Sequence, residues 1–374
     1  MASEMKVFFP LQVFFPSQAG GPANSVYWLA KYLKRNGIEP TVISTDQGVN
    51  TPVRLNRFNE TEAGCVMHVR TRITYFPFVQ MLRSLRGVIG ADVVQVSSVF
   101  FPAAVVSALA ARILHKKLVV SPRDELSQYG LTRSRGRKRP ILWMYRNFIA
   151  RHAVFHATAE KEVADIKGYF TFDVPVVHIP NLIEMPPLIE TDDEPYLLFI
   201  GRLDRKKGVD KLIEAAARSE HFRNGTIKLK VAGKGDAAYE EKLRQLSAKL
   251  GIEGRVEFLG QVEGGEKQRL LAGAAWTFMP SESENFGVVV LESLAQNTPV
   301  VASKGTPWAV LDAEKIGYWV ENSPVELAAI LDRLIMLPED EYAAYRGRCR
   351  AFVERNFEIN ANGRAWLDLY NSLK

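Results

Sequence analysis

The 374 residues of this chain alternate between two patterns of hydrophobic and polar positions. Short runs dense in valine, isoleucine and phenylalanine indicate buried strands, and the stretches between them carry apolar residues at helical spacing. Strands are predicted near Lys6–Phe9, Pro40–Ser44, Asp92–Val96, Leu118–Ser121, Val154–Ala157, Val176–Ile179 and Tyr196–Ile200, and helices over Ala103–Leu114, Gly208–Arg218, Val288–Gln296 and Ile359–Leu373. Strands that alternate with helices in this way predict parallel sheets and hence an α/β fold.

One segment interrupts this alternation. Residues 181–195 are rich in proline and acidic residues, a composition that resists regular structure and suits a connector. The chain is also too long for one ordinary core. We therefore predict an N-terminal domain over residues 1–180, a linker over 181–195 and a C-terminal domain over 196–359.

The composition limits the class of protein. The longest apolar stretch, Val93–Leu114, is interrupted by polar residues and carries Arg112, which argues against a membrane span. The only cysteines, Cys65 and Cys349, lack disulfide or metal spacing, so we expect a reducing compartment and no zinc site. The N-terminus lacks a basic lead followed by an apolar core, so a secretory signal is not predicted. These features favour a cytoplasmic protein.

Two carboxylates lie eight residues apart at the start of an apolar helix, Glu284 in the loop and Glu292 within the helix. The opening amides of this helix, at Phe286, Gly287 and Val288, have no intrahelical acceptor, and together with the helix dipole they attract phosphate. Glu292 can accept two hydrogen bonds from a vicinal diol such as a ribose. The alternative is that both glutamates are simply solvated.

A cationic turn precedes this segment by about eighty residues. Gly201 ends a buried-strand pattern, and Arg202 and Lys207 follow it before the next helix. In open α/β sheets, ligands bind at the carboxyl ends of strands. An arginine fork and a lysine charge can neutralise a diphosphate there, although an ordinary charged turn would have the same composition.

Several short motifs occur in a characteristic order, and together they cover nearly the full length. They are Gly20-Gly21 in the first loop, Gly201-Arg202 through Lys207-Gly208, Gly233-Lys-Gly235, Phe258-Leu-Gly260, the pair Glu284 and Glu292, and Thr298-Pro-Val-Val-Ala. With these motifs the chain resembles retaining glycosyltransferases of family 4, also known as glycosyl transferases group 1. The resemblance implies the GT-B fold, in which two Rossmann-like β/α/β domains face each other across a cleft and the last helix, here residues 360–374, packs on the N-terminal domain.

The resemblance also implies roles for individual residues. Arg202 and Lys207 would bind the donor phosphates, Glu292 the ribose and Glu284 the hydroxyls of the donor sugar. Gly20 and Gly21 would let the N-terminal domain close on the phosphates, and Gly233 would lie at the donor site with Phe286, Gly287 and Val288.

The implied reaction is the transfer of a hexosyl-type sugar, with retention, from a UDP- or GDP-sugar to a saccharide or lipid-linked acceptor, as in cell-surface polysaccharide and lipopolysaccharide biosynthesis. The donor phosphate itself can accept the acceptor proton, so orientation and stabilisation of the leaving diphosphate would carry the catalysis. Neither a metal ion nor a cofactor is expected, and we expect a monomer or weak dimer.

The N-terminal domain is the basic one. Residues 1–180 contain 23 Lys and Arg against 12 Asp and Glu, a net charge of +11, whereas the remainder has 25 against 30, or −5. The densest basic loop, predicted to lead into an aromatic-rich helix, contains Arg133, Arg135, Arg137, Lys138 and Arg139. Such a loop suits an anionic acceptor or peripheral contact with an anionic membrane, and a solvated loop is the alternative. Nucleic acid is disfavoured, because the aromatic residues fit one face of a packed helix.

A second acceptor-side candidate is the loop after the strand at residues 118–121. Many family members carry a histidine there, where this chain has Ser-Pro-Arg123-Asp124-Glu125. Arg123 could stabilise charge on the departing phosphate, and Asp124 or Glu125 could orient an acceptor hydroxyl. A surface turn is the alternative.

Other functions remain open at the level of sequence. Gly233-Lys-Gly235 followed by Ala238 fits a dinucleotide-binding motif, with Glu257 as the ribose ligand, so an oxidoreductase is one alternative. A sugar-nucleotide epimerase of the same fold and a non-catalytic saccharide-binding protein are the others.

Overall fold

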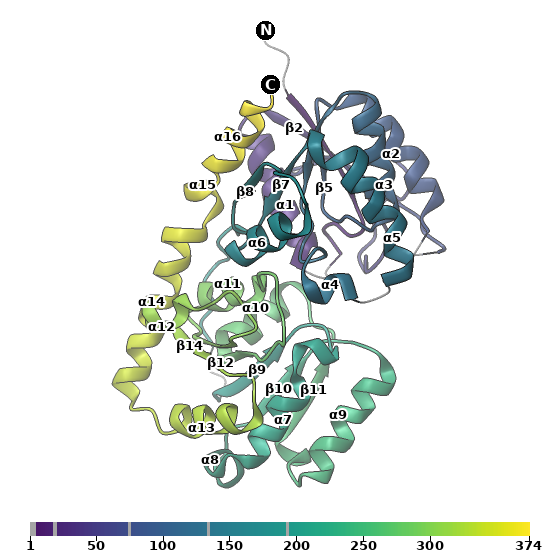
Figure 1. Cartoon of the computed structure of the whole chain (residues 1–374). Coiled ribbons are helices and arrows are strands. Elements are labelled where there is room, and N and C mark those ends of the chain that lie inside the picture. The colour runs from purple at the N-terminus through teal and green to yellow at the C-terminus, as the bar shows by residue number, and fades with distance from the viewer. Residues whose placement is uncertain (1–4, 18–20, 74–75, 133–134, 192–193) are drawn as a thin grey trace. The chain divides into compact units, whose positions relative to one another are not determined.

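The computed structural model describes residues 5–17, 21–73, 76–132, 135–191 and 194–374. They form two compact units, one of Met1–Glu184 with Ile359–Lys374 and the other of Met185–Glu358. We refer to them as unit 1 and unit 2 (Figure 1). Between Glu184 and Glu194 the described residues form no helix or strand.

Unit 1 contains an eight-stranded sheet in the order β3-β4-β2-β1-β5-β6-β7-β8. All neighbouring strands are parallel except β3 and β4. The strands are β1 (Met5–Leu11), β2 (Ile38–Thr45), β3 (Asn59–Thr61), β4 (Gly64–Val69), β5 (Val93–Val96), β6 (Lys117–Val120), β7 (Ala153–Ala157) and β8 (Val176–His178). The six predicted strands of this unit therefore form, with ends shifted by at most two residues.

The helices of unit 1 cover both faces of this sheet. They are α1 (Gly21–Arg35), α2 (Phe78–Gly90), α3 (Pro102–Ile113), α4 (Gln128–Thr132), α5 (Arg135–Met144), α6 (Glu160–Tyr169), α15 (Ile359–Asn362) and α16 (Arg364–Ser372), with a π-helix at Tyr145–Ile149 and a 3-10 turn at Ala150–His152. One core lies under α2, α3 and the π-helix and contains Phe8, Val94, Val120 and Phe155.

Two predictions for unit 1 need correction. The basic segment was expected to be a loop, but helix α5 begins at Arg135, because arginine and lysine are good helix formers and Lys138 anchors the helix by donating to the Gly130 carbonyl at 2.5 Å. The single helix expected over Ile359–Leu373 is interrupted at Gly363. A side chain at Gly363 would lie 2.6 Å from the Tyr32 ring, so glycine permits this close approach.

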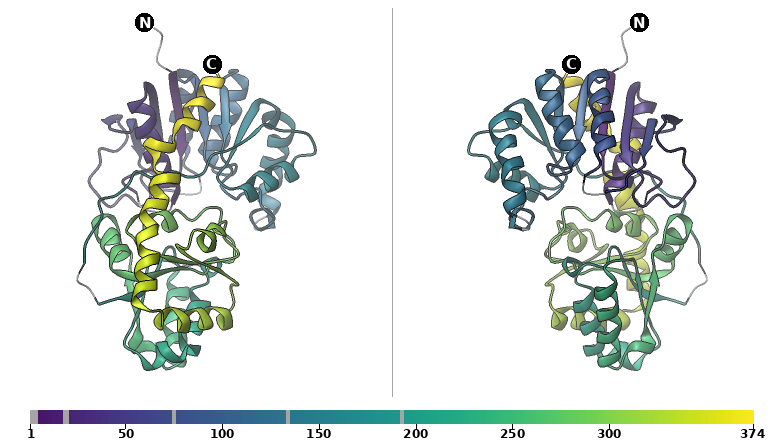
Figure 2. Two further views of the ribbon diagram at one scale, coloured as in Figure 1. Left: turned by 90° about the vertical axis from the view of Figure 1, so that its left-hand side faces the viewer. Right: turned by 90° about the vertical axis from the view of Figure 1, so that its right-hand side faces the viewer.

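The C-terminal residues are held in unit 1 by aromatic side chains. The Trp366 ring lies 4.5 Å from that of His156, and the Tyr370 hydroxyl donates to the Gln95 side chain inside the core. Figure 2 shows α16, in yellow, lying along the strands of unit 1.

Unit 2 contains six parallel strands in the order β11-β10-β9-β12-β13-β14. The strands are β9 (Tyr196–Ile200), β10 (Leu229–Ala232), β11 (Val256–Gly260), β12 (Ala274–Met279), β13 (Val300–Ser303) and β14 (Gly317–Val320). The helices are α7 (Val209–Arg218), α8 (Glu220–Asn224), α9 (Ala237–Lys249), α10 (Gly264–Gly273), α11 (Val288–Ala295), α12 (Val310–Ala313), α13 (Pro324–Ile335) and α14 (Glu339–Phe357), with 3-10 turns at Arg205–Lys207 and Glu253–Arg255. Trp276 and Phe278 fill the centre of its larger core. Each unit is thus a Rossmann-like layered α/β domain.

Candidate functional site

The sheet order of unit 2 brings two candidate segments to one edge. Strands β9 and β12 are parallel neighbours, so their carboxyl ends lie together. The loop after β9 carries Arg202 and Lys207, and the loop after β12 carries Glu284. This edge is where open α/β sheets bind ligands.

Lys207 and Glu284, which are 77 positions apart, form an ion pair at this edge. Both side chains are about one-fifth exposed, Lys207 at 24% and Glu284 at 18%, so the pair remains open to a ligand. The Ser281 hydroxyl also lies 3.4 Å from the same carboxylate oxygen of Glu284. The structure therefore brings together the two residues that the sequence assigned to donor phosphate and donor sugar.

Backbone hydrogen bonds hold the Glu284 loop on two sides. The Glu282 amide donates to the Lys206 carbonyl at 2.8 Å, and the Glu284 amide donates to the Gly305 carbonyl at 3.0 Å. The buried indole of Trp308 donates to the Phe286 carbonyl. Trp308, whose role the sequence did not reveal, thus fixes the end of the loop directly before α11.

Glycines allow these segments to approach. Gly208 has φ 67°, and a Cβ there would lie 2.0 Å from the Pro280 carbonyl oxygen. Gly287 has φ 80°, and a Cβ there would lie 2.7 Å from the Met279 sulfur. Both positions require glycine for conformation and for space.

The start of α11 presents free backbone donors. Gly287 is its N-cap, and within the described part of the chain the amides of Phe286, Gly287 and Val288 have no hydrogen-bond acceptor. The N-terminus of a helix with unpaired amides is suited to an anion.

Glu292 is almost buried in α11, with 5% of its surface exposed. Its carboxylate is held by Lys267 of α10, whose ammonium nitrogen lies 2.6 Å from Oε2 and 2.7 Å from Oε1. No local pattern in the sequence relates Lys267 to Glu292, because the two residues belong to different helices.

Arg202 and the glycine motif after β10 differ in whether their polar groups already have partners within the protein. Arg202 is exposed, and no ion pair or hydrogen bond engages its guanidinium among the described residues. The Gly233 amide donates to the Gly260 carbonyl at 2.6 Å, and the Gly235 amide donates to Glu240 at 2.6 Å. Because both glycine amides are already bonded, and Glu257 instead pairs with Lys228 at 2.5 Å, the dinucleotide-binding alternative finds no support at this motif.

The candidates of unit 1 form a second group. Gly20 lies outside the described residues, and Gly21 is the first residue of α1. Arg123 and Asp124 both have left-handed backbones, with φ 55° and 71°.

Side chains from other segments hold this turn. The Arg123 guanidinium donates to the Asn181 side chain at 2.6 Å. The Asp124 amide donates to the buried Glu162 at 2.9 Å, and Glu162 also accepts from the Thr158 amide at 2.8 Å. The sequence analysis missed Glu162, although a glutamate at the third position of a helix is a known capping signal.

Glu125 is engaged inside unit 1. Its carboxylate accepts from the Ser98 hydroxyl at 2.9 Å and from the Val99 amide at 2.6 Å, bracing the loop before α3. Burial raises the pKa of Glu125 to about 7, against these hydrogen bonds, which lower it. This structural role leaves Asp124 as the better candidate for contact with an acceptor.

His156 is buried and neutral. Its Nε2–H donates to the Ile179 carbonyl and its Nδ1 accepts from the Ser121 hydroxyl, both at 2.8 Å. Burial, with the nearby charge of Arg123, lowers the pKa of His156 to about 3. It supports the sheet rather than titrating at neutral pH.

The basic segment borders a hollow of about 340 Å³. Arg133 and the side chains of Arg135 and Arg137 lie outside what the structure describes. Lys138 points inward, with its ammonium 4.5 Å from the centre of the Phe100 ring. The hollow is lined by Leu131, Arg139, Leu142, Trp143, Arg146 and Tyr169.

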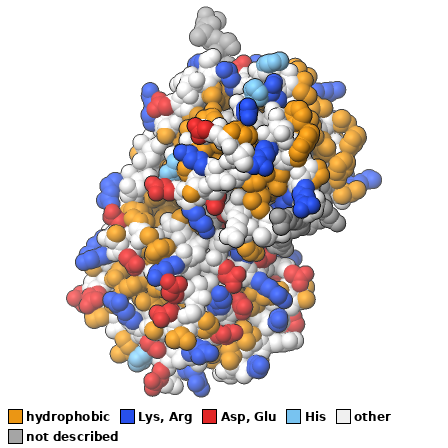
Figure 3. Space-filling model, viewed as in Figure 1, with side chains coloured by type: hydrophobic (Ala, Val, Ile, Leu, Met, Phe, Trp, Pro, Cys, Tyr) orange, Lys and Arg blue, Asp and Glu red, His pale blue; other side chains and the backbone are white. Residues whose placement is uncertain are grey.

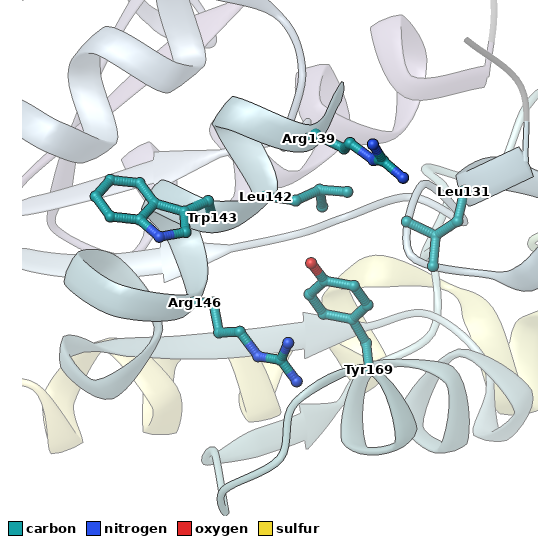
Figure 4. Close-up of a pocket in the computed structure, with 6 residues that line it drawn as sticks. All are labelled: Leu131, Arg139, Leu142, Trp143, Arg146 and Tyr169. Carbon is teal, nitrogen blue, oxygen red and sulfur yellow. The ribbon is translucent and has the colours of Figure 1, made fainter. Parts of the chain in front are cut away.

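Figure 4 shows the Tyr169 ring between the guanidinium groups of Arg139 and Arg146. The hollow thus combines apolar walls with two cationic groups. Every helix in the described part of the chain is too short or too polar to cross a bilayer.

Known families match both units. The model for a glycosyl transferase 4-like domain matches residues 20–181, and that for glycosyl transferases group 1 matches residues 183–350. The chain belongs to the GT-B glycosyltransferases of family 4. The predicted family and fold class are thereby confirmed.

Individual family members match over part of their length. An uncharacterised glycosyltransferase of Methanocaldococcus jannaschii is 38% identical over 146 residues, which are 38% of this chain and 36% of that protein. The lipopolysaccharide core biosynthesis glycosyltransferase LpsE of Rhizobium meliloti is 36% identical over 124 residues, 33% of this chain and 34% of LpsE. The chain thus spans about a third of the length of these curated relatives.

A solved structure of this fold matches nearly the whole chain. HepE of Anabaena, crystallised with UDP-glucose, has a TM-score of 0.76 and 20% identity, covering 98% of this chain and all of that one. At this identity the likeness concerns the fold.

Proposed function

We propose that this protein is a retaining glycosyltransferase that moves a hexosyl-type sugar from a nucleoside diphosphate sugar to a saccharide or lipid-linked acceptor. The observation that carries the proposal is the Lys207–Glu284 ion pair at the carboxyl edge of the unit 2 sheet, in the loop that leads into the free amides of α11. A cation, a carboxylate and unpaired amides are the groups that a sugar diphosphate needs.

The donor would lie on unit 2. Lys207, Arg202 and the amides of Phe286, Gly287 and Val288 would bind the diphosphate, and Glu292 would accept hydrogen bonds from the ribose. Gly233 would border the same edge. Glu284, oriented by Lys207, would accept hydrogen bonds from the sugar hydroxyls.

The proposed reaction does not require a side chain to act as the general base. As the bond between the anomeric carbon and the diphosphate oxygen breaks, the acceptor oxygen bonds to the same face of that carbon. Its proton passes to the departing phosphate oxygen. Lys207 and Arg202 would stabilise the negative charge on the diphosphate, and no metal ion or cofactor takes part, so excess EDTA should leave the rate unchanged.

The acceptor would lie on unit 1. Arg123 and Asp124 are proposed to meet its reacting end, and the hollow between Arg139 and Arg146 suits an anionic group on a saccharide or lipid carrier. The positions of Arg133, Arg135, Arg137 and Lys138 in the sequence add basic charge beside it. The likeness to LpsE favours an acceptor in cell-surface polysaccharide or lipopolysaccharide synthesis at the cytoplasmic face of a membrane.

A thermal-shift panel of uridine, guanosine and adenosine diphosphate sugars tests the donor site. We expect one nucleotide to raise the melting temperature of the wild type and to lose that effect in Lys207→Ala. UDP-glucose is the first donor to try, because HepE was crystallised with it. Transfer to acceptors would then be followed by mass spectrometry, and NMR of the anomeric proton would distinguish retention from inversion.

Two results would refute the proposal. If no sugar nucleotide stabilises the protein, the donor site is wrong. If the donor is converted without any acceptor, the epimerase alternative holds instead.

A further inference from the structure

Helix α2 exposes an apolar stripe. At about 100° per residue, Phe78, Val79, Leu82 and Ile89 fall within an arc of about 100° on one side of the helix. Their exposed fractions are 56%, 47%, 51% and 62%. A helix on the surface of a soluble domain ordinarily turns such a stripe toward the core.

The buried residues of α2 are Gln80, Ser84 and Val88. Gln80 and Ser84 are fully buried, and the Gln80 side chain donates to the carbonyls of Leu11 at 2.7 Å and Ile43 at 3.0 Å. Gly87 lies against the Phe8 ring, which a Cβ would meet at 2.4 Å. Val88 lies in the core and Met81 packs partly against it, whereas Phe78, Val79, Leu82 and Ile89 are left for another surface.

The stripe continues beyond the helix. Ile73 and Phe76, in the segment before α2, are 64% and 55% exposed, and the rings of Phe76 and Phe78 stack with their centres 6.4 Å apart. Ile113 and Leu114 at the end of α3 are also exposed. Figure 3 shows hydrophobic side chains gathered over α2 and α3 on one side of unit 1. Contiguous exposed apolar surface of this kind marks an interaction site.

The positive charge around the apolar stripe of α2 indicates what kind of partner it binds. Between Ala63 and Ala91 the sequence contains four arginines and no acidic residue. Arg83 is bonded to the Asn56 carbonyl at 2.9 Å, whereas Arg70, Arg72 and Arg86 are exposed. An apolar stripe flanked by arginines is complementary to an anionic bilayer, with its acyl boundary and its headgroup phosphates.

We propose that α2, together with Ile73 and Phe76, docks this protein on an anionic lipid bilayer. Phe78, Leu82 and Ile89 enter the acyl boundary, and the exposed arginines contact headgroup phosphates. This surface is distinct from the hollow at α5. It extends the proposed function, because it would bring unit 1 to a lipid-linked acceptor, but it depends on none of the donor contacts.

Sedimentation with vesicles tests the proposal without donor or acceptor. The full chain should bind vesicles of phosphatidylcholine with phosphatidylglycerol more tightly than vesicles of phosphatidylcholine alone. Leu82→Ser with Ile89→Ser should weaken binding to the mixed vesicles by about tenfold or more. Replacement of Arg70, Arg72 or Arg86 by glutamine should weaken it by about fivefold each.

Unit 2 offers a matched control. Val325 and Met336 are both 62% exposed, at the two ends of α13. Val325→Ser with Met336→Ser removes similar apolar surface and should leave vesicle binding unchanged. Since the α2 positions are solvent-exposed, the variants should fold. If the thermal-shift panel identifies a donor, that donor should raise the melting temperature of each variant as much as that of the wild type, which would confirm that the variants fold.

Any one of four outcomes would overturn the proposal. The wild type fails to bind the mixed vesicles, or the Leu82 and Ile89 variant binds them as well as the wild type, or light scattering shows a dimer that this variant converts to a monomer. In the last case a second copy covers α2. A loss of binding in Arg139→Gln with Arg146→Gln, but not in the α2 variant, would likewise place the lipid contact at α5.

Discussion

The ammonium nitrogen of Lys267 lies within 2.7 Å of both carboxylate oxygens of Glu292, so a lysine of α10 holds the glutamate that the sequence assigns to ribose. The pair is the least exposed of the ion pairs among the described residues of unit 2, with side-chain exposures of 17% and 6%. Two helices that border the same sheet edge are thereby tied together through a candidate ligand-binding residue.

Lys267→Met should lower the free energy of unfolding by about 1–3 kcal/mol, because it leaves a nearly buried carboxylate without its partner. Urea unfolding at neutral pH measures this. Adding Glu292→Gln to the same chain should recover part of the loss. Lys228→Met is the control, since its pair with Glu257 is exposed and should contribute less than about 0.5 kcal/mol. Equal losses in the two lysine variants would show that burial does not strengthen the Lys267 pair.

Lys207→Ala and Glu284→Ala should each reduce the rate of sugar transfer by about a hundredfold, in line with the loss of one charge-stabilising contact. Steady-state kinetics with the identified donor give the comparison. Lys211→Ala is the matched control, because Lys211 also pairs with a glutamate of the same loop, Glu282, at 3.2 Å. Its rate should stay within about twofold of the wild type. Near-normal turnover in the Lys207 variant would remove the central role assigned to that residue.

Gly208→Ala should destabilise the protein more than Gly251→Ala. Both glycines have positive φ, 67° and 70°, so each alanine carries a conformational cost of about 1–2 kcal/mol. At Gly208 the new methyl group also meets the Pro280 carbonyl at 2.0 Å, whereas nothing lies within 4 Å of that at Gly251. Only Gly208→Ala should also weaken donor binding, because the loops of Lys207 and Glu284 must separate. Thermal unfolding and donor titration of both variants measure these effects. Equal changes in melting temperature and in donor affinity for Gly208→Ala and Gly251→Ala would contradict the prediction.

Two side chains of unit 1 with shifted pKa values, His156 and Glu125, should give opposite pH dependences of the free energy of unfolding. His156 has a folded pKa of about 3 against an ordinary 6.5, so its contribution is lost as the pH falls from 6.5 toward 3. Glu125 has a folded pKa of about 7 against 4.5, so the protein gains stability as the pH falls from 7 to 4.5. Between pH 6.5 and 4.5 the contributions of His156 and Glu125 to the pH dependence of the free energy of unfolding should largely cancel.

Replacing one of the two residues at a time should reveal the pH dependence that the other contributes to the free energy of unfolding. In Glu125→Gln the His156 contribution remains, and the free energy of unfolding should fall by about 1.4 kcal/mol more per pH unit on acidification than in the wild type. In His156→Gln the slope should have the opposite sign. Urea unfolding at pH 6.5, 5.5 and 4.5 would measure both, and parallel profiles for all three proteins would contradict the assignment.

Local pattern predicted much of this protein. Runs such as Tyr196–Ile200 are strands because their apolar density suits a sheet buried on both faces, and the Gly208–Arg218 segment became α7 because its apolar residues recur at helical spacing. Short motifs, including Arg202 to Gly208 and Glu284 to Glu292, were sufficient to indicate the family. These features depend on neighbours within a few positions, which a single sequence displays.

Contacts between distant segments were decided only by the tertiary structure. The spacing of Lys207 and Glu284 does not encode that β9 and β12 are neighbours, and nothing local relates Lys267 to Glu292. The apolar residues of α2 illustrate the same limit, because hydrophobic spacing alone predicts that Phe78 and Leu82 face the core. The helix instead buries Gln80 and Ser84 beside Val88, and the Gln80 side chain donates to the carbonyls of Leu11 and Ile43 beneath the helix. The sequence thus determined which elements form, and the packing of those elements determined which side chains meet and which remain free to bind a partner.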